Sequence, residues 1–316
     1  MKIMSADYDV VVVGAGMAGL SAALTAGRLG RKVALLSSGV PGGQLLGIEH
    51  IDGLPGRDGG VAGYELCPAA QEQCEAAGVE LVTEAVERIA AAGADWIVSG
   101  PGGAFRARAV IVASGAALAK LGVPGEADFE GRGISACADC DAPLLRGKAA
   151  VVVGGGDSAM QEALVVADHA GQVLLVTDGE ALRGQAGYRE RIAAHERIAL
   201  RFGATVSGIA GDANGVTAVT IQNIASGAAE EVATDALFIF VGLVPNSGFL
   251  GDLVPLDLKG HVMVDAGLRT AARGICAAGN VRAGGSFRAA GVMGDGTVAA
   301  TTIEDYLTTG AWPSAD

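Results

Sequence analysis

Cysteines are scarce in this sequence, and so are long apolar runs and positive charges. Five cysteines in 316 residues are too few for a scaffold held together by disulfides. Half of the residues are hydrophobic, yet no uninterrupted apolar run approaches the ~20 residues of a membrane helix. The segment from Met1 to Asp9 lacks the basic region and apolar block of a secretory signal. We therefore expect a cytoplasmic, reducing environment and no membrane partner.

The shortage of positive charge excludes another class of partner. The net charge is −13 at pH 7, whereas nucleic acids and anionic membranes bind basic surfaces. We expect no nucleic-acid partner. The length of 316 residues is sufficient for two domains, each with its own hydrophobic core.

Glycine, in contrast, is abundant, with 50 residues. The pattern G-x-G-x-x-G/A consequently recurs, at Gly14–Gly19, Gly131–Ala136, Gly154–Ala159 and Gly294–Ala299. A bare match is weak evidence in such a composition, because the pattern is informative only between a buried strand and a helix. Gly131–Ala136 follows no strand, and we discount it.

Two of these matches have the required surroundings. Each is preceded by an apolar strand and followed by an Ala-rich helix and a second strand; the predicted elements are Tyr8–Val13, Leu20–Leu29 and Lys32–Leu36, then Ala149–Val153, Met160–Ala170 and Gln172–Thr177. Glycines at such a turn let a pyrophosphate approach the backbone at the helix N-terminus. The alternative is a βαβ unit that binds nothing.

The fourth match predicts a helix of its own. Gly294-Asp-Gly-Thr297 is expected to open a helix over Thr297–Leu307, preceded by the apolar stretch Gly274–Asn280. A helix N-terminus at a strand end can face an electron-rich ring, because its dipole favours negative charge.

The order of these parts predicts a discontinuous first domain. We expect an α/β fold with two Rossmann-like dinucleotide-binding domains of the three-layer ββα type, the second inserted into the first. The first would contain residues 1–117 and 246–316, and the second residues 118–245. Trp96–Ser99, Pro101–Ala107 and Ala109–Ala113 are predicted to be short strands joined by turns.

Cys137-Ala-Asp-Cys140, followed by Asp141, is the most informative stretch. Two thiols separated by two residues can close a disulfide and open it by accepting two electrons, and a neighbouring carboxyl group can move the proton. The alternatives are a zinc half-site and inert cysteines. Zinc normally takes four ligands, and there is no second C-x-x-C.

The remaining cysteines and the histidines show no such pattern, and we predict no metal site. Cys67 and Cys74 lie seven residues apart on one face of a predicted helix, where buried structural thiols are expected, and Cys276 lies in an apolar strand. The four histidines are scattered along the chain and are expected to be surface or satisfied core residues: His50, His169, His195 and His261.

Six motifs in order resemble the low-molecular-weight thioredoxin reductase family of FAD-dependent pyridine nucleotide-disulfide oxidoreductases. They cover nearly the whole chain: Gly14–Gly19, Pro41–Gln44, Cys137–Asp141, Gly154–Ala159, Gly242–Asn246 and Ala277–Val281. The resemblance implies FAD in the first domain and a redox disulfide in the second. It also implies a homodimer, and a rotation between domains that presents the cysteines alternately to flavin and partner.

The resemblance also implies which residues contact FAD. These are Gly14, Gly16, Met17, Ala18, Gly19, Ser37, Gly42, Gly43, Gln44, Val86, Ala113, Ser114, Gly115, Gly279, Asn280, Arg288 and Ala289. The chain departs from the family at three of these places. Asn280 stands where the family usually has Asp, Ser37 stands where many relatives have Glu, and Phe287-Arg-Ala289 replaces Tyr-Arg-Gln.

For the chemistry, the resemblance implies that Cys140 is the sulfur on the flavin side and that Cys137 exchanges with the substrate disulfide. Asp141 would be the general acid–base partner. Asp139 between the cysteines is less usual in the family. A second carboxylate there is expected to disfavour the thiolate of Cys137.

The electron donor is the point at which the chain departs most from its family. The resemblance implies nucleotide contacts at Gly154, Gly156, Asp157, Ser158, Ala159 and Asp178. NADPH-dependent relatives have His-Arg-Arg and a later Arg after the second Rossmann unit, but here only Arg183 is present. A carboxylate at the strand end binds a free 2′-hydroxyl and repels a phosphate, so Asp178 favours NADH over NADPH.

Other interpretations of these departures stay open. The chain could take electrons from ferredoxin, or run in the opposite direction as a dithiol oxidase that passes electrons through FAD to oxygen. It could also be a flavin-bound redox sensor without turnover. The partner of the disulfide would be a thioredoxin-like protein or a small-molecule dithiol or disulfide.

Overall fold

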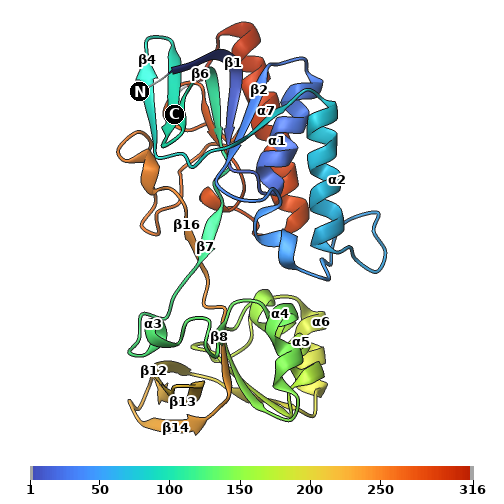
Figure 1. Ribbon diagram of the computed structural model, residues 1–316, viewed down its shortest axis with the longest axis vertical. Helices are drawn as coiled ribbons and strands as arrows, with labels where there is room; N and C mark the ends of the chain where they lie inside the picture. The colour runs from blue at the N-terminus through green and yellow to red at the C-terminus, as the bar shows by residue number, and fades with distance from the viewer. Residues whose placement is uncertain (1–2, 314–316) are drawn as a thin grey trace. The chain divides into compact units, whose positions relative to one another are not determined.

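The computed structural model describes residues 3–313 and divides the chain into two compact units (Figure 1). The first contains residues 1–117 and 244–316, and the second contains residues 118–243. The expected insertion of one α/β unit into the other is confirmed. The chain returns to the first unit at Val244, two residues before the predicted position 246. This boundary lies inside strand β16, Leu243–Pro245. This strand pairs with β7, Ala116–Leu118, at the other crossing.

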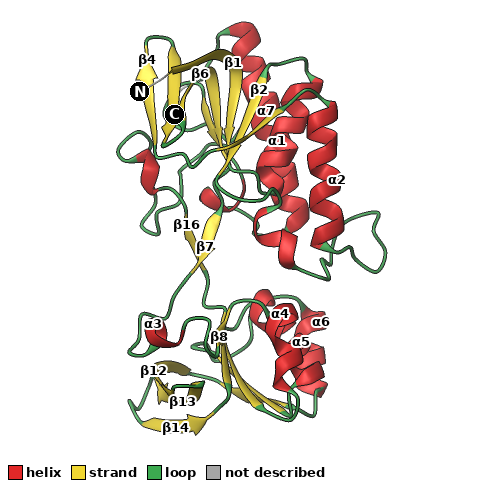
Figure 2. Ribbon diagram, in the orientation of Figure 1, coloured by secondary structure: helices red, strands yellow, loops and turns green. Residues whose placement is uncertain are grey.

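The first unit is built on a sheet with the strand order β3-β2-β1-β6-β5-β4, and β17 also pairs with β6. Its strands are β1 (Ile3–Val13), β2 (Val33–Ser37), β3 (Glu80–Thr83), β4 (Arg88–Ala92), β5 (Asp95–Gly100), β6 (Gly103–Val112) and β17 (Ile275–Ala277). Its long helices are α1 (Met17–Arg28), α2 (Gly63–Ala76) and α7 (Ala289–Thr309). All three lie on the same side of the sheet (Figure 2).

The alternation of side chains along β1 produces two cores. Val10 and Val12 pack into a cluster with residues of α1, α2 and α7. Val11 and Val13 face the opposite side, where they pack with residues of β4, β5 and β6. Successive side chains of a strand point to opposite faces, so one buried strand separates a helical layer from a second β layer. This is the expected three-layer ββα arrangement.

Strand β6 corrects one prediction. The sequence predicted two short strands, over Pro101–Ala107 and Ala109–Ala113, but Gly103–Val112 is a single strand. The intervening residue, Arg108, forms an ion pair with Asp9 on β1 instead of breaking the strand. One continuous strand can therefore pair antiparallel with β5 near its start and parallel with β17 near its end.

Helix α7 corrects another prediction. It begins at Ala289, so Gly294 and Gly296 lie inside the helix and do not open it. A Cβ atom at Gly296 would lie 2.2 Å from the backbone oxygen of Ala18 on α1. The fourth glycine match is therefore required by close packing between α1 and α7.

The second unit contains a parallel sheet with the order β11-β10-β9-β15-β8 and a separate antiparallel sheet, β12-β13-β14. The parallel strands are β8 (Ile134–Ser135), β9 (Ala149–Val153), β10 (Gln172–Val176), β11 (Ile198–Arg201) and β15 (Ala236–Ile239). The antiparallel strands are β12 (Ala204–Asp212), β13 (Gly215–Asn223) and β14 (Ala229–Ala233). The helices are α3 (Glu126–Phe129), α4 (Ala138–Asp141), α5 (Asp157–His169) and α6 (Ala186–Ala194).

Both predicted βαβ units are present, with helices that begin earlier than expected. Helix α1 begins at Met17 rather than Leu20, and α5 begins at Asp157 rather than Met160. The end of each glycine motif is therefore the first turn of the helix. In both motifs the third position, Gly19 or Ala159, lies in the helix and packs back onto the first glycine.

Candidate redox site and cofactor-binding turns

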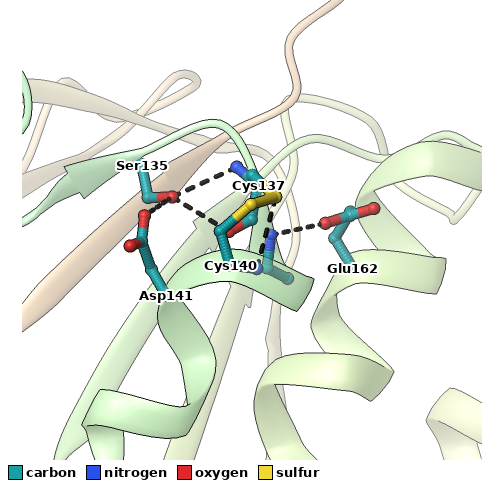
Figure 3. The surroundings of a disulfide bond; sticks show 6 residues. Ser135, Cys137, Cys140, Asp141 and Glu162 are labelled. Atoms are coloured by element: carbon teal, nitrogen blue, oxygen red, sulfur yellow. Dashed lines mark hydrogen bonds between the residues drawn. A yellow bond between two sulfur atoms is a disulfide. The ribbon is translucent and has the colours of Figure 1, made fainter. Parts of the chain in front are cut away.

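Cys137 and Cys140 form a disulfide at the start of helix α4 (Figure 3). Cys137 is the residue before the helix and has an extended backbone, with φ −143° and ψ 101°. The backbone N–H of Cys140 donates to Sγ of Cys137 at 3.2 Å. Cys140 is exposed and Cys137 is half-buried, whereas Ala138 between them is completely buried. The pair therefore rests on a buried anchor and presents its sulfur atoms near the surface.

Ser135, at the end of β8, connects the disulfide to the neighbouring acid. Its Oγ accepts the backbone N–H of Cys137 at 3.1 Å and donates to Oδ2 of Asp141 at 2.5 Å. Figure 3 shows Asp141 and Cys137 on either side of this hydroxyl. Sequence reasoning selected both of these residues but missed Ser135. Its position two residues before the first cysteine was the available signal.

Glu162 of helix α5 is a second residue that sequence reasoning missed. Its Oε2 accepts the backbone N–H of Ala138 at 2.8 Å. Burial raises the pKa of this carboxyl group; the hydrogen bond from Ala138 opposes the shift, and the charge of Asp139 adds to it. A lone glutamate in an amphipathic helix gives no sequence signal for such a contact.

In the first unit, the glycine turn between β1 and α1 leaves its backbone open. Gly14 has φ +102°, and a Cβ atom there would lie 2.4 Å from the oxygen of Ala113. A Cβ atom at Gly19 would lie 1.7 Å from the oxygen of Gly14, whereas nothing lies within 4 Å of the Cβ position at Gly16. Met17 and Ala18 are buried in the first turn of the helix. The turn thus combines tight packing behind it with free space at Gly16, which fits a pyrophosphate.

A second loop meets this turn. The N–H of Gly42 donates to the oxygen of Ala15 at 2.7 Å, and a Cβ atom at Gly43 would lie 3.1 Å from Cα of Gly16. Gln44 donates its side-chain amide to the oxygen of Ala116 at 2.5 Å. The structure therefore brings the Pro41–Gln44 motif against the first glycine motif.

Asn280 carries an orphaned buried polar atom. Among the side chains of residues 8–313, its Oδ1 is the one buried nitrogen or oxygen without a hydrogen-bond partner. Its neighbour Gly279 lies against α1, because a Cβ atom there would be 2.8 Å from Cβ of Ala18. An unsatisfied acceptor beside the glycine turn fits a hydroxyl of a bound ligand, such as the ribityl chain of FAD.

Asp295 of α7 supports this loop and was also missed from the sequence. It accepts the N–H of Gly279 at 3.0 Å and forms a bidentate ion pair with Arg282, at 2.6 and 2.7 Å. Both charged side chains are mostly buried. The pattern Gly294–Ala299 contains Asp295, but sequence reasoning treated those residues as a helix start.

The other predicted FAD contacts lie on the surrounding loops. Ser37 ends β2, with its hydroxyl bonded to the oxygen of Gly39, and partly buried Val86 follows β3. Ala113, Ser114 and Gly115 follow β6, and Ser114 exchanges two hydrogen bonds with Asn246. Arg288 and Ala289 form the N-terminus of α7.

The glycine turn of the second unit is partly occupied by the chain itself. Gly154 has φ +143°, and nothing lies within 4 Å of the Cβ position at Gly156. The N–H of Arg183 donates to the oxygen of Gly155 at 2.7 Å, and Asp157 accepts the N–H of Gln185 at 2.7 Å. The carboxylate of Asp157 therefore fixes the following loop, which was not foreseen. Ser158 and Ala159 lie in the first turn of α5.

Asp178 follows strand β10 and forms an ion pair with Arg183, at 2.9 Å. Both side chains are largely exposed. The hydroxyl of Thr177 lies 3.5 Å from the same carboxylate oxygen. The cation that remains in this stretch is thus already neutralised by a carboxylate, which reduces its attraction for a phosphate.

The three other cysteines are buried thiols, as expected. Cys67 and Cys74 lie on α2, and Cys276 lies on β17. Burial raises the pKa of all three thiols, that of Cys74 to about 11. Because the thiolate is the reactive form, these residues are poor nucleophiles at neutral pH.

Within residues 8–313, no group of three or more His, Cys, Asp and Glu side chains comes together in a way that could hold a metal ion. No helix in that part of the chain has the length and apolar composition needed to cross a membrane.

A family model described as pyridine nucleotide-disulphide oxidoreductase matches residues 8–301. The chain is 37% identical to the thioredoxin reductase of Treponema pallidum over 306 residues, which are 97% of this chain and 99% of that protein. It is 33% identical to the thioredoxin reductase of Bacillus subtilis over 300 residues, 95% of each protein.

A solved structure shows the same similarity. The crystal structure of Lactococcus lactis thioredoxin reductase in its FR conformation matches with a TM-score of 0.92 and 34% identity. The match covers 95% of this chain and 99% of that chain, so it includes both units.

Proposed function

This chain belongs to the pyridine nucleotide-disulphide oxidoreductase family, and from that premise we propose that it carries electrons from NADH through FAD to the Cys137–Cys140 disulfide and on to a thioredoxin-like protein. It is a flavin-dependent disulfide oxidoreductase. The observation that carries the proposal is the surface disulfide at the start of α4, with Asp141 held beside it by Ser135.

The residues of the first unit fit FAD. The open backbone at Gly16 suits the pyrophosphate, and the orphaned Oδ1 of Asn280 suits a ribityl hydroxyl. The remaining predicted contacts, from Ser37 to Ala289, are proposed on the resemblance and on their positions around this turn. When bound, FAD supplies the two-electron carrier between nucleotide and disulfide.

The geometry of the pair supports separate roles for its two sulfur atoms. Opening the disulfide to a dithiol consumes two electrons and two protons. The N–H of Cys140 that points to Sγ of Cys137 stabilises a thiolate at Cys137, so this sulfur attacks the partner's disulfide. Cys140 then attacks Cys137 in the mixed disulfide, which restores the internal disulfide and releases the partner as a dithiol. Asp141 moves the proton in each direction, in an orientation that Ser135 maintains.

The nucleotide is proposed to bind at Gly154–Ala159, with Asp178 on a ribose hydroxyl. The open Cβ position at Gly156 and the N-terminus of α5 suit a pyrophosphate. The Asp178–Arg183 pair favours NADH, because a 2′-phosphate would meet a carboxylate and an arginine that is already paired.

The thioredoxin-like partner is proposed from the shared name of the relatives. The expected homodimer and the rotation between domains stay predictions.

An anaerobic titration of the purified yellow protein tests the donor. Bleaching of the flavin by NADH at far lower concentration than by NADPH supports the proposal. Reduction by neither nucleotide, together with reduction by a small dithiol, would identify a dithiol oxidase. Reduction only by a reduced ferredoxin would identify a ferredoxin-dependent enzyme, and bleaching without any disulfide turnover would identify a redox sensor.

A further inference from the structure

Glu162 is held against the redox pair although it belongs to another helix, and the mechanism above does not use it. Its Oε2 accepts the backbone N–H of Ala138 at 2.8 Å, and the two residues are separated by 24 positions in the sequence. Figure 3 shows the side chain reaching from α5 toward the start of α4. Ala138 directly follows Cys137 and is completely buried, so its N–H requires a partner from within the protein.

Cys137 is restrained on both sides by this contact and by Ser135. Its own N–H donates to Oγ of Ser135 at 3.1 Å, and the next N–H, that of Ala138, donates to Glu162. Cys137 precedes the helix with an extended backbone, so the N–H groups of Cys137 and Ala138 have no helical acceptor, whereas the carbonyl oxygen of Cys137 accepts the N–H of Asp141. Fixing the two peptide groups that flank a residue also fixes the direction in which its side chain leaves the backbone. Here that direction points the sulfur at Cys140.

The hydrogen bond from Ala138 can form in both ionisation states of Glu162, and it is stronger to the carboxylate. Burial raises the pKa of this carboxyl group, an effect that the bond from Ala138 opposes and the charge of Asp139 increases. A protonated carboxyl group keeps an oxygen that can accept an N–H. The contact can therefore persist when a negative thiolate forms nearby.

We infer that Glu162 is a positioning residue for the Cys137–Cys140 pair, which it keeps in the arrangement required for disulfide closure. The inference rests on the proposed redox role of this pair. When the start of α4 is held in place, the two reduced thiols remain close together, and their effective concentration for closing the disulfide is high. Glu162 therefore favours the disulfide over the dithiol.

Equilibration of the purified protein with mixtures of reduced and oxidised dithiothreitol tests this inference. Two electrons and two protons pass from dithiothreitol, which becomes a cyclic disulfide, to the pair, which becomes a dithiol. After an acid quench and thiol labelling, mass spectrometry of the peptide that contains both cysteines gives the equilibrium constant.

Three variants separate the hydrogen bond from charge and from general disturbance of α5. Glu162→Met has a similar length but no oxygen acceptor, and we expect it to shift the equilibrium about tenfold toward the dithiol. Glu162→Gln keeps an acceptor oxygen and is expected to stay within about threefold of the original protein. Asp168→Asn removes an exposed acid elsewhere on α5 and should leave the constant unchanged.

Either of two results would overturn the inference. One is an equilibrium constant for Glu162→Met equal to that of the original protein. The other is a shift in Glu162→Gln as large as that in Glu162→Met, because charge and not the hydrogen bond would then be responsible. Glu162→Ala provides a second variant without an acceptor, and circular dichroism verifies that each variant is folded. No nucleotide or partner protein enters this equilibrium, and under anaerobic conditions electron exchange with bound flavin does not alter the constant between the pair and dithiothreitol, so failure of the proposed function would be recognised separately.

Discussion

The hydroxyl of Ser135 donates a hydrogen bond to Oδ2 of Asp141 across 2.5 Å. Oγ of Ser135 also accepts the backbone N–H of Cys137 at 3.1 Å. One small side chain thus orients both the proposed acid–base group and the proposed nucleophile. Both contacts are short-range in sequence, at separations of two and six residues, and they form where the chain passes from β8 directly into α4.

Replacement of this hydroxyl should impair turnover without removing the disulfide. We expect Ser135→Ala to lower kcat for reduction of a small aromatic disulfide by about tenfold, because Asp141 loses its fixed orientation. Steady-state kinetics with that substrate gives the measurement. Ser226→Ala, in the exposed turn after β13, is the control and should be unaffected. An unchanged kcat in Ser135→Ala would show that Asp141 needs no such support.

Removal of Asp178 should change the choice of nucleotide. In Asp178→Ala the guanidinium group of Arg183 is released from its ion pair and the carboxylate that repels a phosphate is gone. We expect the ratio of kcat/KM for NADPH to that for NADH to rise by at least about tenfold. Glu180→Ala removes an exposed acid from the same loop and serves as the control. Equal ratios in the two variants would place the determinant elsewhere.

Removal of the unpaired Oδ1 of Asn280 should weaken the binding of FAD. Asn280→Leu removes the acceptor, and we expect FAD to bind about tenfold more weakly, whereas Asn280→Asp keeps an acceptor and should retain flavin. Equilibrium dialysis, with the flavin concentration on each side determined from its absorbance, measures the affinity for FAD.

The same variant separates a ligand contact from a structural one. Without flavin, Asn280→Leu should be at least as stable as the original protein, because it removes a buried polar atom that has no partner. Marked destabilisation of the flavin-free variant would instead assign Asn280 a structural role.

Two glycines of α7 should respond to alanine in opposite directions. A Cβ atom at Gly296 would lie 2.2 Å from the oxygen of Ala18, so Gly296→Ala should destabilise the first unit by about 1–3 kcal/mol. Nothing lies within 4 Å of the Cβ position at Gly294, so Gly294→Ala should stabilise the helix by about 0.5–1 kcal/mol. Urea unfolding measures both. Stabilisation by both substitutions would mean that α1 and α7 do not need this close contact.

The buried thiols should resist alkylation and should contribute a dependence of stability on alkaline pH. In the reduced protein at pH 8, iodoacetamide should modify Cys137 and Cys140 but not Cys67, Cys74 or Cys276. With a pKa of about 11, Cys74 is a thiolate in about one molecule in a thousand at that pH. Peptide mass spectrometry provides the measurement, and the same reaction in denaturant, where all five cysteines should react, provides the control.

The sign of the pH effect follows from the raised pKa. From about pH 9, the ordinary value, to about pH 11, the unfolded chain has released the Cys74 proton and the folded chain still holds it. Unfolding thus releases a proton in this range, and the free energy of unfolding falls as the pH rises. Urea unfolding of Cys74→Ala should show a weaker decline over the same range.

Much of the fold could be predicted because its signals are local. Apolar strands followed by glycine and an Ala-rich helix specified both βαβ units. The helix starts were wrong by three residues, at Met17 and Asp157, and the first strand begins at Ile3 rather than at Tyr8. Helix α7 was mispredicted because two glycines normally end or interrupt a helix. They are tolerated here because α1 lies against them, and that contact joins residues far apart in the sequence.

The sequence by itself determined the chemistry that this protein can perform: two cysteines spaced for a disulfide, an adjacent acid, and two glycine turns suited to dinucleotides. Those properties depend on residue type and short spacing, which the chain order specifies directly. Only the tertiary structure decided what surrounds them. Ser135 and Glu162 hold Cys137, Asp295 supports the Asn280 loop, and Asp157 is used to fix the loop at Gln185. Most of these contacts join separate elements, so folding alone brings their partners within hydrogen-bonding distance.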